Sequence, residues 1–247
     1  MNSPIYTGDT KALALKILQE KAVVIRDVDG GEKPFLYSSG NWGPGYCMIK
    51  GLVGKKWLMK ELVKALAYRV ASAASKIEFV AANATGGMVP GWILSECLED
   101  NRPYGLQRPV PYVYVRGTRK KGGHGELVTG IENNDLIGHG QRALVVEELV
   151  NFAETTCNSA EALRELGYEV THAACILFYD NPVAKQRLKD TGVESIHLLT
   201  LPEILDVAEA EKTHAPHVIQ SYRDFLADPK EWQSKRGLKL VASGGTQ

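Results

Sequence analysis

The middle of this 247-residue chain alternates short apolar runs with amphipathic segments, and this alternation constrains the fold more than any other feature. Five runs have the composition of buried strands: 77–84, 110–117, 142–149, 169–180 and 195–201. Amphipathic segments follow four of them, at 92–100, 158–167, 182–192 and 202–212. Parallel strands need crossovers of this kind, and strands so apolar are covered on both faces. We therefore predict an α/β fold with a mostly parallel sheet and flanking helices.

The flanking parts of the chain have a different pattern. A long helix is predicted over 55–75, and an apolar stripe begins near Leu13. Between them, PFLYSSGNWGPGYC contains too many glycines and prolines for a long regular element. The stretch 221–237 predicts a helix and a turn. We expect one structural domain with three parts: N-terminal helices with the compact stretch (1–75), an α/β core (76–210), and a C-terminal helix and tail (211–247).

Composition excludes several classes of protein. The 29 basic side chains balance the 29 acidic ones, so charge gives no argument for a nucleic-acid or membrane-surface partner. No apolar segment approaches the roughly 20 residues of a membrane span, and the N-terminus has no apolar run long enough for a secretory signal. The four cysteines are scattered without a CxxC pair. We expect a cytoplasmic protein.

Three unusual stretches follow consecutive predicted strands: TGGMVPG at 85–91, RGTRKKGGHG at 116–125, and EELVNFAETTCNS at 147–159. Parallel sheets bind ligands beyond the carboxyl ends of their strands, so these stretches are expected to meet at one edge. The coincidence is the main evidence for a binding site that the residues alone provide.

The third stretch suits a phosphorylated sugar. Glu147 and Glu148 stand where the predicted strand stops, and carboxylates suit either the vicinal hydroxyls of a ribose or the shell of a magnesium ion. The run that leads into the next predicted helix consists of Thr155, Thr156, Cys157, Asn158 and Ser159. Its N–H groups and hydroxyls favour a phosphate. The alternative is that the acids are solvated and that Asn158 or Ser159 only caps a helix.

The other two stretches add backbone and cations. The glycine turn contains Thr85, Gly86 and Gly87, where a ligand can approach the backbone closely. The cationic loop contains Arg116, Lys120 and His124, and a loop of this kind can close over a pyrophosphate. Taken separately, the first is also consistent with a plain tight turn and the second with a solvated surface loop.

These stretches, in this order, resemble the type I phosphoribosyltransferases, and most closely the orotate phosphoribosyltransferases. FLYSSGNWGPGY is similar to the family's FxLxSGxxSPxY, and ATGGMVPG occupies the place of its pyrophosphate loop. YVRGTRKKGGHG resembles the YxRKxxKxHG loop. VVEELVNFAETTCNSAEALRELG resembles the phosphoribosyl pyrophosphate signature, in which a strand and two acids precede TTGGS and a helix. The likeness covers nearly the whole chain.

The resemblance implies transfer of a phosphoribosyl group from phosphoribosyl pyrophosphate to a base nitrogen, with Mg2+ as cofactor and a homodimer as the assembly. Glu147 and Glu148 would hold the ribose hydroxyls, and Thr155–Ser159 the 5-phosphate, with the N–H groups of Cys157 and Asn158. Arg116, Lys120 and His124 would act at the pyrophosphate. The N-terminal stretch would form a small hood over the base.

The chain departs from the family pattern at several positions. About four residues, around NFAE, are predicted as an insertion before TTCNS, and Cys157 and Asn158 replace two glycines. Gly117 stands at the first lysine of the cationic loop. Asp180 or Asn181 replaces the arginine that faces the orotate carboxylate in many relatives. The base is therefore orotate or a related one.

Two other functions are weighed against this one. A non-catalytic nucleotide- or phosphoribosyl-binding regulatory or assembly protein on the same scaffold would explain the altered phosphate loop. A nicotinamide-dependent oxidoreductase is disfavoured because no GxGxxG follows the first strand of the alternating region.

Overall fold

The computed structural model describes residues 9–37, 40–74, 76–99, 106, 108–117, 127–132 and 134–239. These residues belong to two compact units. Most of the first unit is Lys50–Thr200, and the second combines Thr10–Ile49 with Leu201–Gln247. The part boundaries predicted at residues 75 and 210 stay predictions. None of the helices in the described ranges combines the length and apolarity of a membrane span.

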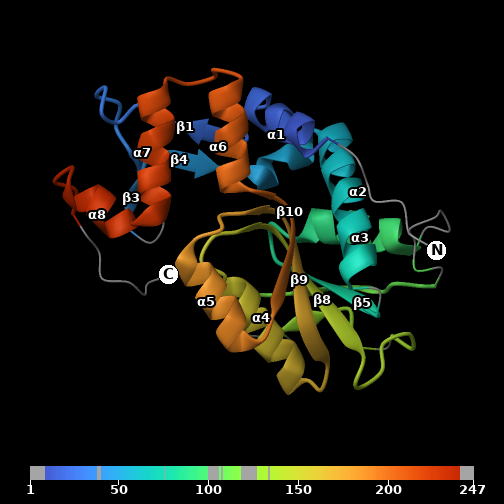
Figure 1. The fold of residues 1–247 in the computed structure, drawn as a ribbon. Coiled ribbons are helices and arrows are strands. Elements are labelled where there is room, and N and C mark those ends of the chain that lie inside the picture. The colour runs from blue at the N-terminus through green and yellow to red at the C-terminus, as the bar shows by residue number, and fades with distance from the viewer. Residues whose placement is uncertain are drawn as a thin grey trace. The chain divides into compact units, whose positions relative to one another are not determined.

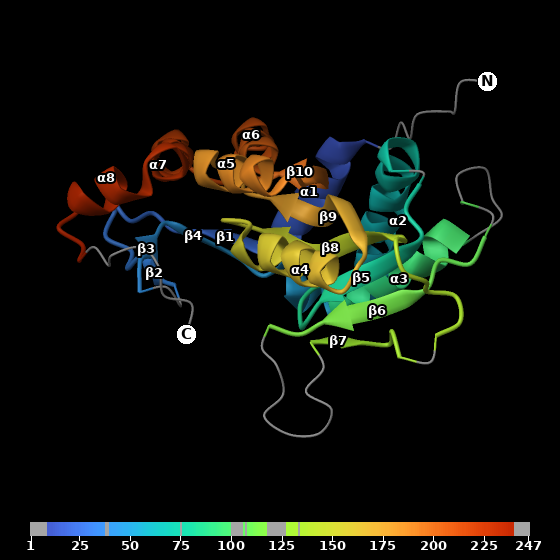
Figure 2. The ribbon, with the colours of Figure 1, turned by 90° about the horizontal axis from the view of Figure 1, so that it is seen from below.

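A six-stranded sheet organises the first unit (Figure 1). Its strands are β5 (Phe79–Asn83), β6 (Tyr112–Val115), β7 (Val128–Thr129), β8 (Arg142–Val150), β9 (Glu169–Phe178) and β10 (Glu194–Thr200). They lie in the order β10-β9-β8-β5-β6-β7. Every pair is parallel except β6 with β7, a short antiparallel pair at the edge of the sheet that Figure 2 shows. The predicted α/β fold with a mostly parallel sheet is confirmed.

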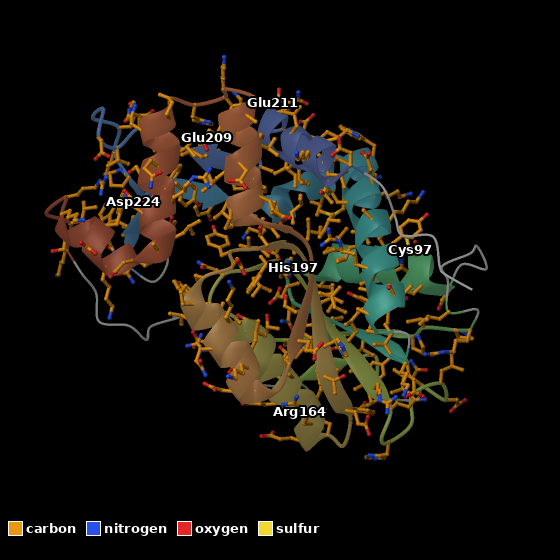
Figure 3. All side chains as sticks on the ribbon, in the orientation of Figure 1. Cys97, Arg164, His197, Glu209, Glu211 and Asp224 are labelled. Carbon is orange, nitrogen blue, oxygen red and sulfur yellow. The ribbon has the colours of Figure 1, made fainter. Side chains whose placement is uncertain are left out.

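Helices cover both faces of this sheet. They are α2 (Lys56–Ala73), α3 (Met88–Glu99), α4 (Glu154–Glu165) and α5 (Pro182–Thr191), and the short η1 (Ile49–Gly54) precedes them. Figure 1 shows the α2–α3 pair and the α4–α5 pair on opposite sides of the strands. At the end of α4, Arg164 (Figure 3) donates from Nη1 to the carbonyl of Thr191 at 2.7 Å, which fastens α4 to the end of α5.

The core of this unit explains why its strands are so apolar. All five residues of β5 are buried. On one face, Phe79 and Ala81 join a core cluster that includes Cys157 and Leu163 of α4. On the other face α3 packs closely, because a Cβ on Gly91 would lie only 2.6 Å from that of Ala82. A strand between two helical layers has no face left for polar residues, which makes the exception at its last position notable.

The second unit combines the N-terminal and C-terminal segments. It contains α1 (Thr10–Gln19), β1 (Val23–Ile25), β2 (Phe35–Leu36), β3 (Trp42–Gly43), β4 (Gly45–Cys47), α6 (Leu201–Ala210), α7 (Pro216–Ala227) and α8 (Pro229–Ser234). β1 pairs with β4 and β2 with β3, both antiparallel. Short strands are what the glycines and prolines of this stretch permit, as predicted. The hood role of the stretch stays a prediction, and its residues 38 and 39 lie outside the described residues.

The apolar stripe near Leu13 belongs to α1, which ends at Gln19, and Lys21 adopts a φ of 54° before β1. One element boundary in the second unit differs from that predicted. The C-terminal helix begins five residues earlier than predicted, where Pro216 provides its first turn. Polar contacts join the two ends of the sequence: His217 Nε2 lies 3.1 Å from Asp27 Oδ2.

Candidate functional site

At the carboxyl edge of the sheet, the two central strands β5 and β8 end at different levels. Ala82 pairs with Val146, so Asn83 at the end of β5 lies level with Glu147. β5 turns away at this point, whereas β8 continues beside β9 as far as Val150. As predicted, the two acids lie near the end of their strand, next to the point where the neighbouring strand β5 has ended.

Glu147 is the buried member of the pair. Its exposed fraction is 9%, and Nδ2 of Asn83 donates to its Oε1 at 2.7 Å. Burial raises the pKa of Glu147 to about 8, and the neighbouring Glu148 adds to the rise while the Asn83 hydrogen bond opposes it. Burial thus favours the protonated form of this carboxyl. Replacing it by alanine would disturb the fold, contrary to the expectation for a solvated strand-end acid.

Glu148 is more accessible, and it faces the glycine turn. Burial raises its pKa, while hydrogen bonds from its own backbone and from Glu147, and the positive charge of Lys50, lower it. A Cβ on Gly86 would collide with the Glu148 carboxylate, and one on Gly87 with the carbonyl of Val146. The turn that contains Thr85, Gly86 and Gly87 therefore packs directly on β8, and the structure brings together the first and third predicted stretches.

The predicted phosphate run has a different conformation from the one expected. Thr155, Thr156, Cys157, Asn158 and Ser159 all belong to α4, which begins at Glu154. The N–H of Cys157 donates to the carbonyl of Ala153 at 2.9 Å, so it is not available to a phosphate, and Asn158 is one residue deeper in the helix. Thr156 and Ser159 are buried, at 2% and 6% exposed. A role for the remaining groups of this run in substrate binding stays a prediction.

The connection between β8 and α4 is shorter than predicted, because α4 begins at Glu154 and not after the run 155–159. Asn151, Phe152 and Ala153 join β8 to α4, so the predicted insertion around NFAE is the connection itself. Ala153 has a φ of 58°, in the left-handed region that glycine adopts without steric strain. This connection contributes no hydroxyl before Thr155.

The charges at the start of α4 are already paired. Arg187 of α5 donates from Nη1 to the carbonyl of Phe152 at 2.8 Å and lies 3.9 Å from the carboxylate of Glu154. Glu154 is the first residue of the helix, where a negative charge is favoured by the helix dipole. A phosphate that approached this helix end would meet a carboxylate in the same position.

The cationic loop is only partly described. Arg116 follows β6, and its side chain contacts the β6–β7 pair through Nε to Thr129 Oγ1 at 3.2 Å and Nη2 to the Tyr114 hydroxyl at 3.1 Å. Lys120 and His124 lie outside the described residues. Their predicted action at the pyrophosphate stays a prediction.

Sequence reasoning missed three residues of this region: Asn83, Lys50 and Arg187. Asn83 gave a signal, because it is the only amide in the apolar run IEFVAANA. Lys50 and Arg187 come from distant segments and gave none. Their proximity to Glu148 and Glu154 follows from the packing of η1 and α5, which periodicity does not predict.

Solved structures with this fold include several proteins of nucleotide metabolism. UMP synthase of Leishmania donovani aligns with a TM-score of 0.69 and 20% identity over 89% of this chain, which spans 42% of that chain. Orotate phosphoribosyltransferase from Aeropyrum pernix aligns with a TM-score of 0.61 and 24% identity over 82% of this chain and 99% of that one. The Mycobacterium tuberculosis orotate phosphoribosyltransferase in complex with 5-phospho-alpha-D-ribosyl 1-diphosphate has a TM-score of 0.54 at 18% identity, over 79% of this chain and 98% of that one. The fold is that of the type I phosphoribosyltransferases.

Curated relatives extend the likeness along the sequence. Orotate phosphoribosyltransferase of Listeria monocytogenes serovar 1/2a is 28% identical over 222 residues, which are 90% of this chain and 97% of that protein. The Bacillus caldolyticus orotate phosphoribosyltransferase is also 28% identical over 222 residues, 90% and 98% of the two chains. No protein-family model matches the sequence. The resemblance to the orotate phosphoribosyltransferases is confirmed over nine-tenths of the chain.

The left-handed residue before α4 gives a prediction about stability. Ala153→Gly should raise the free energy of unfolding by about 1 kcal/mol, because it removes a Cβ from a left-handed backbone. Urea unfolding measures the change. The matched control is Ala162→Gly in the interior of the same helix, which should lower stability by about 0.5–1 kcal/mol. A loss of stability in both variants would contradict the left-handed conformation.

The buried carboxyl gives a prediction about pH. The pKa of Glu147 rises from an ordinary value of 4.5 to about 8, so between these limits the folded chain keeps a proton that the unfolded chain releases. The free energy of unfolding should therefore fall as pH rises through this window. Glu147→Gln cannot titrate and still accepts from Asn83, so it should be more stable than the parent at pH 8 and similar near pH 4.5.

Unfolding by urea across the same window measures this difference. Glu161→Gln, at an exposed position of α4, serves as the control, and its difference from the parent should be small throughout. A Glu147→Gln difference that does not depend on pH would contradict the protonated state of this carboxyl, whose surroundings include Asn83, Glu148 and Cys175.

Proposed function

We propose that this chain is a pentosyltransferase that joins orotate or a related base to phosphoribosyl pyrophosphate and releases pyrophosphate. The observation that carries the proposal is the contact between the adjacent acids and the glycine turn at the carboxyl edge of the sheet. Relatives named orotate phosphoribosyltransferase match nine-tenths of the chain, and a neighbour in structure was solved with phosphoribosyl pyrophosphate.

The chemistry assigns different roles to the groups at this edge. Displacement of pyrophosphate places positive charge on the ribose and negative charge on the leaving group. Glu148, the more accessible acid, accepts a hydrogen bond from a ribose hydroxyl. Glu147 stabilises Glu148 through the hydrogen bond between the two carboxyls. The turn at Gly86 and Gly87 faces the pyrophosphate, and Arg116, Lys120 and His124 neutralise its growing charge.

Mg2+ completes this proposal as the cofactor. Within the described residues, no group of three or more His, Cys, Asp or Glu side chains is arranged to hold a metal ion. Mg2+ does not require a cage of protein ligands. It keeps several waters and binds mainly through phosphate oxygens of its substrate. The ion would supply charge neutralisation at the pyrophosphate.

A homodimer in the cytoplasm is the setting that the resemblance favours. In the family, the loop that corresponds to Lys120 and His124 is often supplied across a dimer interface. The balanced charge of the chain agrees with small-molecule substrates and with no nucleic-acid or membrane partner.

The alternative is a non-catalytic nucleotide- or phosphoribosyl-binding protein on the same scaffold. One observation favours it: the connection before α4 contributes no hydroxyl, and Glu154 already lies at the helix end where a 5-phosphate would bind. The two functions differ in a direct assay, because the alternative predicts binding without release of pyrophosphate.

Pyrophosphate release tests the enzyme function. With phosphoribosyl pyrophosphate, Mg2+ and orotate, the parent chain should release pyrophosphate, and uracil, which lacks the carboxylate, shows whether that group is required. Glu148→Gln should lower kcat/KM by roughly tenfold or more, because a neutral amide stabilises a positive ribose less than a carboxylate does. No release with any pyrimidine, purine or nicotinic-type acid would overturn the enzyme proposal, and calorimetric binding of phosphoribosyl pyrophosphate would then support the alternative.

The charge at the start of α4 gives a second prediction. Glu154→Gln should tighten phosphoribosyl pyrophosphate binding by about two- to fivefold, because it removes a carboxylate from the helix end where the 5-phosphate is proposed to lie. Isothermal titration measures the dissociation constant. Glu161→Gln, two turns further along the same helix, is the control and should leave it unchanged. Equal effects of the two variants would place the phosphate elsewhere.

A further inference from the structure

Asn83 is an exception in its strand. The other four residues of β5 are apolar, yet the last is an amide whose exposed fraction is 1%. Nδ2 donates to Oε1 of Glu147 at 2.7 Å, while Oδ1 is buried and has no hydrogen-bond partner among the described residues. The unpartnered Oδ1 lowers stability, because a buried polar atom without a hydrogen bond has lost its water. The contribution of the amide at this position is therefore its contact with Glu147.

The position of Asn83 links two parts of the proposed site. Side chains alternate along a strand, so Asn83 and Glu147 point to the same side as Ala81 and Val145, which lie in the core cluster with α4. The carbonyl of Asn83 also accepts from the N–H of Gly87 at 2.9 Å. One residue thus contacts the buried acid through its side chain and the glycine turn through its backbone.

We propose that Asn83 is a positioning residue for the pentose site. It holds the carboxyl of Glu147 at a fixed place relative to the glycine turn, so that Glu148 can bind the sugar. The inference rests on the proposed function. An amide suits this task because its N–H donates to the carboxyl whether or not the carboxyl is ionised, and it adds no charge of its own. Without it, Glu147 would be left buried with no donor from β5.

Asn83→Leu tests the proposal by removing the donor at nearly constant volume. KM for phosphoribosyl pyrophosphate should rise roughly tenfold or more, with a smaller change in kcat. Ser95→Ala is the matched control, because Ser95 is 7% exposed and donates to the carbonyl of Val110 at 2.8 Å within the same unit. It should lose stability and keep its KM. A parental KM in Asn83→Leu would overturn the proposal.

Asn83→Asp gives a readout that a purely structural role would not change. Two carboxyls in hydrogen-bond contact must share a proton, and raising the pH removes it. The rise in KM relative to the parent should therefore be small at acid pH and grow as pH increases. A ratio of KM values that is constant with pH would overturn the proposal, and this variant decides the question if Asn83→Leu does not fold.

The contact can also be tested in a chain that shows no turnover. The amide donor lowers the folded-state pKa of Glu147, so Asn83→Leu should move the upper limit of the pH window over which stability falls to higher pH, whereas Ser95→Ala should leave it in place. An unmoved window refutes the Asn83–Glu147 contact. A moved window without pyrophosphate release would refute only the proposed function.

Discussion

A carboxyl group buried at the centre of a parallel sheet must be neutralised or hydrogen-bonded, and the arrangement around Glu147 follows from that requirement. Burial raises its pKa to about 8, and Nδ2 of Asn83 supplies the donor. The donor can reach it because β5 ends level with Glu147 while β8 continues. The glycine turn then packs on β8, since only residues without a Cβ fit against Glu148 and the Val146 carbonyl. Each contact depends on the one before it.

Two adjacent glutamates thus acquire different properties from their surroundings. Glu147 is buried beside the end of β5, and burial raises its pKa, whereas Glu148 is more accessible and is attracted to Lys50. Different burial and different neighbouring charges give two residues of the same type different pKa values, and so can give them different roles. In the proposed reaction the outer acid meets the sugar, and the inner one supports the strand that presents it.

Much of the fold was predictable from the sequence, because apolar runs between amphipathic segments determine where strands and helices form. The meeting of 85–87 with Glu148 was predictable too, since parallel strands end at one edge. The start of α4 was not. Threonine and serine commonly cap helices, which suggested a loop at 155–159, but Thr156 and Ser159 are buried and the turn is made by Ala153 in a left-handed conformation. Such a conformation gives little signal at an alanine.

That difference divides the proposed site into two halves. The sugar and pyrophosphate half keeps its two acids and its glycine turn. In the phosphate half, Phe152 and Ala153 precede α4, and Arg187 already pairs with Glu154 at its first position. A helix end that carries its own carboxylate favours an added phosphate less than an open one does. In the proposed reaction, binding energy for the phosphorylated pentose therefore comes mainly from the acids and the pyrophosphate loops, and the proposed support of Glu147 by Asn83 is part of that half.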